Sequence, residues 1–218
     1  MERQTIVSAR KLADFINKTP EVLIINPQDC PYKNHVGAIF TDIILQAGLN
    51  YKTIVFPRVQ YVLKTYPEAY TVSDFSNIIY LNGIENVINW KNQIKIERMF
   101  LLIEFCKQNN LETTNDIKKY LLNKLNKLEF LKINGIGNKT LDYMLKLLSI
   151  DTVAVDRHIF SFVEKAGIES DDYKYVKLVV EYAADIMGIT RRAIDYSIWS
   201  YMSNNANKTP LFMNFNEN

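Results

Sequence analysis

The segment from Leu131 to Thr140 has the residue types of a phosphate-binding turn followed by a reactive amine. It reads Leu-Lys-Ile-Asn-Gly-Ile-Gly-Asn-Lys-Thr, so two of the chain's seven glycines flank one apolar residue, Ile136. Glycines permit a tight turn and close backbone approach, and the first amides of a following helix point outward with the positive end of its dipole behind them. We predict a phosphate-binding junction between two helices. A glycine C-cap in an ordinary helical turn is the alternative.

A second candidate is Asp156, which ends the short apolar run Thr152-Val-Ala-Val. A helix of about 15 Å and a short extended link separate it from Lys139. This arrangement can bring a lysine amine and a carboxylate into one cleft beside the turn. The alternative role for Asp156 is a helix N-cap, worth about 1 kcal/mol.

The elements that must position these residues are helices. Apolar residues recur at helical spacing along most of the chain, and no sustained alternation of period two occurs. We predict an all-α fold with helices over 8–18, 36–47, 54–65, a short one from Ser73, 84–90, 94–106, 116–128, 138–148, 157–166, 172–187 and 190–202. Two of these have apolar faces that we expect to be buried, formed by Ile96, Met99, Phe100 and Ile103, and by Ile117, Tyr120, Leu121, Leu125 and Leu128.

Composition excludes several classes of protein. The 218 residues are 48% hydrophobic and 23% charged, as in a folded globular chain. No apolar run approaches the ~20 residues of a membrane span, and the first ten residues lack the apolar core of a secretory signal. Cys30 and Cys106 provide neither a disulfide framework nor a four-thiolate metal site. We therefore expect a cytoplasmic protein with no membrane contact.

Positive charge is concentrated around the candidate turn. The formal net charge is only +2, but seven lysines face two acidic residues, Glu129 and Asp142, between Lys118 and Lys146. A local basic stretch indicates contact with an anion such as nucleic acid. A solvated helix face is the alternative.

The two motifs together resemble the helix-hairpin-helix (HhH-GPD) DNA glycosylases. That superfamily includes endonuclease III, the adenine glycosylase acting on 8-oxoguanine mispairs, and the 8-oxoguanine glycosylases. Upstream, Ile44-Leu-Gln-Ala47 resembles the helix before the DNA-intercalating loop. Residues 92–99, with Lys95 and Glu97, resemble the helix after the second DNA-contacting loop. The Asp156-Arg-His-Ile form and the 194–199 helix are most similar to the small archaeal-type 8-oxoguanine glycosylases.

The resemblance implies a two-lobed helical fold with a DNA-binding cleft between the lobes. One lobe would comprise residues 36–150 and end in the helix-hairpin-helix at about 118–148. The other would join 1–35 to 151–218. The implied partner is double-stranded DNA containing a lesion or mispair, bound by a monomer on the nucleoid of a prokaryotic cell.

The resemblance also implies a mechanism. Lys139 would attack C1′ of a flipped-out nucleotide, and Asp156 would stabilise the cationic sugar and assist proton transfer. Relatives without lyase activity lack the lysine, so Lys139 implies an associated abasic-site lyase. No cofactor is required. The iron–sulfur branch has four cysteines after its catalytic aspartate, which this chain lacks, so we expect no cluster.

Further roles follow from the same resemblance. The expected DNA-binding residues are Gly135, Ile136, Gly137, Asn138, Thr140, Lys132, Gln46 and Asn50. The carbonyls of Leu131, Ile133 and Ile136 would hold a monovalent cation in the DNA complex. Trp90 would wedge or stack, or else belong to the core, and Phe212 and Phe215 would cover the base pocket, or else belong to an ordinary tail.

The sequence does not determine which base would be removed. An oxidised purine such as 8-oxoguanine is favoured, with oxidised pyrimidines and thymine or uracil opposite guanine as alternatives. A non-catalytic helix-hairpin-helix DNA-binding protein is the second alternative, and a helical interaction protein is the third.

Overall fold

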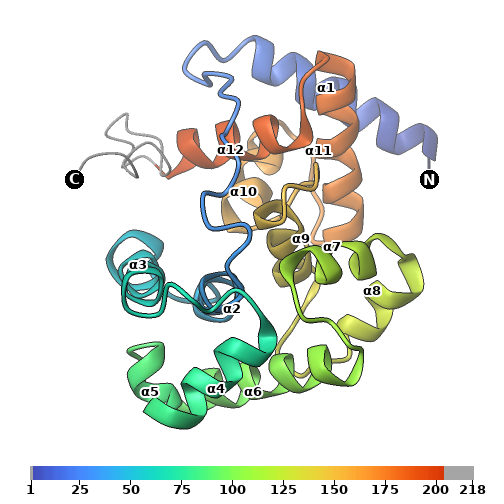
Figure 1. Cartoon of the computed structure of the whole chain (residues 1–218). Coiled ribbons are helices and arrows are strands. Elements are labelled where there is room, and N and C mark those ends of the chain that lie inside the picture. The colour runs from blue at the N-terminus through green and yellow to red at the C-terminus, as the bar shows by residue number, and fades with distance from the viewer. Residues whose placement is uncertain (1, 204–218) are drawn as a thin grey trace. The chain divides into compact units, whose positions relative to one another are not determined.

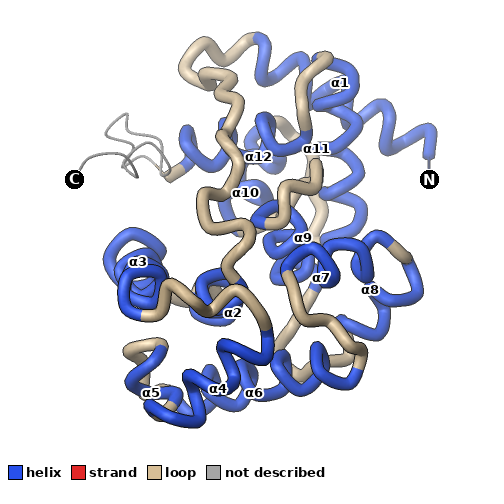
Figure 2. The backbone as a smooth tube through the Cα atoms, in the orientation of Figure 1, coloured by secondary structure: helices blue, strands red, loops and turns tan. Residues whose placement is uncertain are grey.

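A computed structural model of the chain describes residues 2–203, and within them it contains helices and loops but no strand (Figure 2). The prediction of an all-α fold is confirmed. One isolated β-bridge joins Thr71 and Thr113. Phe212 and Phe215 lie outside the described residues. No helix in the described range is long and apolar enough to cross a membrane.

The chain divides into two compact units. One is the continuous stretch Tyr32–Ser149, and the other combines the residues up to Pro31 with those from Ile150 onward. The candidate turn and Lys139 belong to the first unit, and Asp156 belongs to the second.

The unit around Asp156 is a four-helix assembly joined by an extended segment. Its helices are α1 (Glu2–Asn17), α10 (Arg157–Lys165), α11 (Tyr173–Met187) and α12 (Arg191–Met202). α1 packs along α11, and α12 packs against both α10 and α11 (Figure 1). Their apolar faces enclose Val153 and Val155 of the extended segment, which places the residue before Asp156 in the core.

The unit around Lys139 is built on α2 (Val36–Leu45), in which all ten residues are buried. It continues with the π-helix η1 (Tyr51–Val55), α3 (Phe56–Thr65), α4 (Val72–Asn82), α5 (Ile84–Val87), α6 (Gln93–Gln108), α7 (Thr114–Leu122), α8 (Lys124–Phe130) and α9 (Asn138–Leu147). α2 contacts η1, α3, α4, α6 and α9, and is therefore the central helix of the unit (Figure 1).

Several helix starts differ from the sequence-based predictions, three of them for reasons that the caps or the packing show. The first helix begins at Glu2, and Ser8 lies inside it with its hydroxyl 2.8 Å from that of Tyr175. The helix expected from Ser73 begins at Val72, because Thr71 and Asp74 form a capping box. The helix expected from Ile54 is preceded by η1, which Asn50 caps.

The single helix expected over 116–128 is wrong. Thr113 and Asp116 form a capping box that starts α7 earlier, and Asn123 is extended (φ −80°, ψ 132°) and begins α8. The break turns Leu125 and Leu128 outward, with 70% and 58% of their surface exposed. Phe100 is also 47% exposed, so it does not belong to the buried face of α6.

Candidate functional site

The junction between α8 and α9 is a tight turn closed by its own apolar residues. Ile133 and Ile136 are buried, and the Ile136 amide donates to the Ile133 carbonyl at 3.0 Å. Gly135 has φ +83°, a left-handed conformation that favours glycine. Burial of Ile136 holds the turn against the unit while the glycines on both sides remain exposed.

The exposed end of this turn is open. Gly137 is extended (φ −105°, ψ 179°), and a Cβ added there meets no atom within 4 Å. It is the N-cap of α9 and supplies no side-chain acceptor to the first amides of that helix. Uncapped amides at a helix N-terminus favour an anion, both as hydrogen-bond donors and through the helix dipole.

Lys139 lies in the first turn of α9, directly after this open end. Its side chain is half-buried, and it forms no hydrogen bond or ion pair with any residue that the structure describes. Its charge lowers the pKa of a second lysine, Lys95 of α6, so the two ammonium groups are neighbours.

Lys95 is buried and fixed. Its Nζ donates to the carbonyls of Ile44 (2.6 Å) and Ala47 (2.8 Å), at the C-terminal end of α2. Burial, and then the positive charges of Arg98 and Lys139, lower the pKa of Lys95 to about 8. Lys95 therefore both fixes the end of α2 and contributes to a positively charged region around Lys139.

Arg98 is the third cation of this region, and the sequence analysis missed it. Its side chain lies against Gly135, so a Cβ built at that glycine collides with the Arg98 guanidinium. Arg98 lies one helical turn after Lys95, which places both on one face of α6. The spacing of Lys95 and Arg98 in the sequence could have indicated that they share a face of α6. The contact between this face and the turn at Gly135 is visible only in the fold.

A buried carboxylate anchors α9 to the rest of the unit. Asp42 of α2 is fully buried, and its Oδ2 accepts from the hydroxyls of Tyr32 (2.6 Å) and Tyr51 (3.2 Å) while Oδ1 accepts from Tyr143 (3.1 Å). Burial raises the pKa of Asp42 to about 6. Since Tyr143 lies one turn after Lys139, this cluster fixes the face of α9 that carries the lysine. A lone acid inside an apolar helix was the sequence signal for it.

The remaining predicted residues of the turn take different positions. Lys132 is exposed and paired with Glu129 at 2.8 Å, and Asn138 is half-buried. The Thr140 side chain is buried, so only its backbone amide remains for a ligand. The carbonyls of Leu131, Ile133 and Ile136 lie in the same turn. That of Ile133 already accepts one amide, and its second lone pair is still compatible with a cation ligand.

Gln46 and Asn50 flank the loop after α2. Gln46 is the C-cap of α2, and its buried Nε2 finds no acceptor among the described residues. Asn50 is exposed and caps η1, with its Oδ1 accepting from the Thr53 amide at 3.0 Å. Asn50 therefore serves in the fold as the N-cap of η1.

Asp156, in the other unit, caps α10. Its Oδ1 accepts from the amides of His158 (2.8 Å) and Ile159 (3.1 Å). Asp156 therefore has the N-cap role that was its alternative in the sequence analysis, and this role uses only one of its two carboxylate oxygens. The half-buried carboxylate keeps lone pairs for further contacts.

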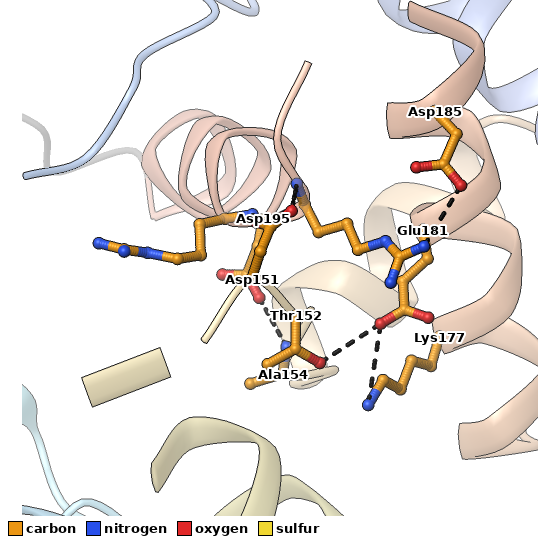
Figure 3. Close-up of polar contacts among 9 residues, drawn as sticks. Asp151, Thr152, Ala154, Lys177, Glu181, Asp185 and Asp195 are labelled. Carbon is orange, nitrogen blue, oxygen red and sulfur yellow. Dashed lines mark hydrogen bonds and ion pairs between the residues drawn. The ribbon is translucent and has the colours of Figure 1, made fainter. Parts of the chain in front are cut away.

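The segment before Asp156 is held by acids of α11 and α12 (Figure 3). The Ala154 amide donates to Asp195 Oδ2 at 2.7 Å, and the Thr152 hydroxyl donates to Glu181 Oε1 at 3.3 Å. Asp151 accepts from the amides of Arg191 and Arg192 at the start of α12. These contacts fix the backbone that directly precedes Asp156.

A family model described as a domain of unknown function (DUF8548) matches residues 92–203, more than half of the chain. The chain belongs to this family. The DUF8548 segment begins at the N-cap of α6 and includes Lys95, Arg98, the turn, Lys139 and Asp156. No curated protein and no solved structure matches the chain.

Other groups that could support chemistry are few in the described range. Cys30 and Cys106 are buried cysteines that form no disulfide with each other, and burial raises the pKa of the Cys106 thiol to about 12. Across residues 2–203, no cluster of His, Cys, Asp and Glu side chains is arranged to hold a metal ion. The cationic region around Lys139 is thus the candidate site.

Proposed function

We propose that the chain is a DNA glycosylase with an associated abasic-site lyase activity, built on the two-lobed HhH-GPD fold. The observation that carries the proposal is the setting of Lys139. Its amine follows an open, uncapped Gly-Ile-Gly turn and has no partner among the described residues. Its side chain is half-buried, and its charge is one of those that lower the pKa of Lys95.

The turn positions the DNA strand. The amides after Gly137 and the guanidinium of Arg98 bind a backbone phosphate. The carbonyls of Leu131, Ile133 and Ile136 would hold a monovalent cation, which would supply further positive charge near the phosphate. Such contacts fix the register of the strand without reading its sequence. The target nucleotide is flipped out, because its glycosidic bond is unreachable within the stack.

Lys139 then acts as the nucleophile. Its neutral amine forms a bond to C1′ as the glycosidic bond breaks, and the electron pair of that bond leaves with the base, which takes up a proton. Loss of the amine proton and opening of the sugar give a Schiff base, and β-elimination breaks the C3′–O bond.

Asp156 assists by stabilising positive charge on the sugar and accepting a proton. The substrate is duplex DNA with an oxidised purine, bound by a monomer, and the protein acts on the nucleoid of a prokaryotic cell. The chemistry needs no cofactor and no iron–sulfur cluster.

A panel of duplexes carrying one lesion each tests this function. Base release and strand cleavage are measured with and without alkali. We expect release of one oxidised purine by the unmodified protein and by Lys146→Gln, a control lysine on the same helix, and no release by Lys139→Gln. Binding of every duplex without release of any base would instead support a non-catalytic DNA-binding module. Strand breaks that form only after alkali treatment would show that the protein releases the base but has no lyase activity.

A further inference from the structure

A pocket of about 680 Å³ lies in the same unit as Lys139, where α3 faces α5 and the loop that precedes α6. This volume is within the range of pockets that bind small molecules. The residues that give the pocket its chemistry are Arg58, Tyr61, Glu85, Asn89, Trp90 and Lys91. Neither proposed catalytic residue lies among them, and Trp90 is the one for which the resemblance implies a DNA contact.

The centre of the pocket is a preorganised stack. The Arg58 guanidinium carbon lies 4.5 Å from the centre of the Trp90 ring. Its Nε donates to the Asn89 carbonyl at 2.9 Å and its Nη1 to the Ile54 carbonyl at 2.7 Å. Asn89 is held in the left-handed region at φ +47°. The guanidinium plane is therefore fixed before any ligand arrives.

The lining selects the charge of a ligand. Because the pocket's own arginine covers a face of Trp90, that face is not available to an organic cation. Arg58 and Lys91 together outweigh Glu85, so an anion is favoured. The Trp90 Nε1–H is buried and has no acceptor among the described residues, which adds a donor in need of a partner.

The lining also selects the shape of a ligand. Tyr61 presents a second aromatic ring with 37% of its surface exposed. Guanidinium planes and aromatic rings both stack against nucleobases. An amide such as that of Asn89 offers a donor and an acceptor, the pair that reads the edge of a base.

We propose that this pocket binds one unpaired nucleotide, with the base stacked on Arg58 or Tyr61 and the phosphate on Lys91. The nucleotide is either free or part of a DNA strand, since both present the same chemistry. The proposal does not require Lys139 to be catalytic, so it stands or fails independently of the proposed function.

Calorimetric titration of the full chain with each deoxynucleoside 5′-monophosphate tests the proposal. We expect saturable binding that Lys91→Glu and Arg58→Lys each weaken by about tenfold or more. Lys91 is exposed, so its substitution leaves the fold intact. The matched control is Lys165→Gln, which removes a cation–π pair with Tyr201 in the other unit and leaves binding unchanged.

Three further titrations identify the ligand. Inorganic phosphate and a nucleoside without phosphate should each bind more weakly than the nucleotide. Binding of a short single-stranded oligonucleotide in place of the mononucleotide, with the same sensitivity to Lys91→Glu and Arg58→Lys, assigns the pocket to a nucleotide within a strand. Absence of saturable binding by both ligands, or binding that neither substitution weakens, overturns the proposal.

Discussion

Neither backbone strain nor lack of space requires Gly137 to be glycine. Its backbone is extended, and an added Cβ would meet nothing within 4 Å. Gly135, by contrast, has φ +83° and lies against Arg98. The fold therefore requires glycine at the first position, whereas at the second a role in the proposed DNA binding is the explanation that we test.

This difference gives a paired prediction. Gly137→Ala should lower the melting temperature only slightly, because glycine is preferred over alanine at an N-cap, and should lower affinity for duplex DNA by about tenfold. Gly135→Ala should lower the free energy of unfolding by about 1–2 kcal/mol or more, since the left-handed conformation disfavours alanine. Thermal melts and DNA titrations of both variants check this. Equal DNA affinity for Gly137→Ala and the unmodified protein would show that DNA binding does not require glycine at this position.

Arg98 should contribute one phosphate contact. Arg98→Gln is expected to weaken DNA binding and to reduce the slope of log affinity against log salt concentration by about 1. Affinities measured over a series of salt concentrations give this slope. Arg10→Gln, an exposed change on α1, is the control and should leave it unaltered. An unchanged slope for Arg98→Gln would show that Arg98 packs against the turn but does not contact a phosphate.

Asp42 should make stability depend on pH. Its pKa is about 6 in the folded chain against an ordinary value of 3.8, so the folded state holds the proton more tightly. The stabilisation from protonated Asp42 is full below about pH 4 and lost as pH rises to about 6, on the order of 3 kcal/mol. Urea unfolding between pH 4 and 7 should show this loss in the unmodified protein relative to Asp42→Asn. Parallel pH profiles for the two proteins contradict it.

At the scale of elements, the extended segment 151–155 depends on acids from helices that follow it in the chain. Asp195 accepts the buried Ala154 amide, which makes α12 the support for the backbone before Asp156. Asp195→Ala should lower the free energy of unfolding by about 1–3 kcal/mol, since it leaves that amide unsatisfied. Asp195→Asn, which keeps an acceptor oxygen, should lose less. Equal losses in chemical denaturation would show that this hydrogen bond does not carry the effect.

The accuracy of the sequence-based predictions also varied by element. The turn at Gly135 and the helix α9 that follows it were predictable, because glycine spacing and helical periodicity are local signals. The break at Asn123 was not, since the apolar periodicity of α7 continues in register through α8. Arg98 and the tyrosines around Asp42 were also missed, because their roles arise from contacts between helices distant in sequence.

At the scale of the whole molecule, the two proposed catalytic residues belong to different units. The Tyr32–Ser149 unit carries Lys139 on α9, and the unit completed by Ile150 onward carries Asp156 on α10. The DUF8548 segment, residues 92–203, contains both residues.

The most direct measurement is reductive trapping of the protein on DNA. Borohydride is added during the reaction with a duplex that carries the lesion recognised by the protein. It should reduce the Schiff base and leave one covalent protein–DNA adduct, which peptide mapping assigns to Lys139. Asp156→Asn should form the same adduct more slowly, and Lys139→Gln should form none. An adduct on another residue, or none with any lesion that the protein releases, contradicts the account.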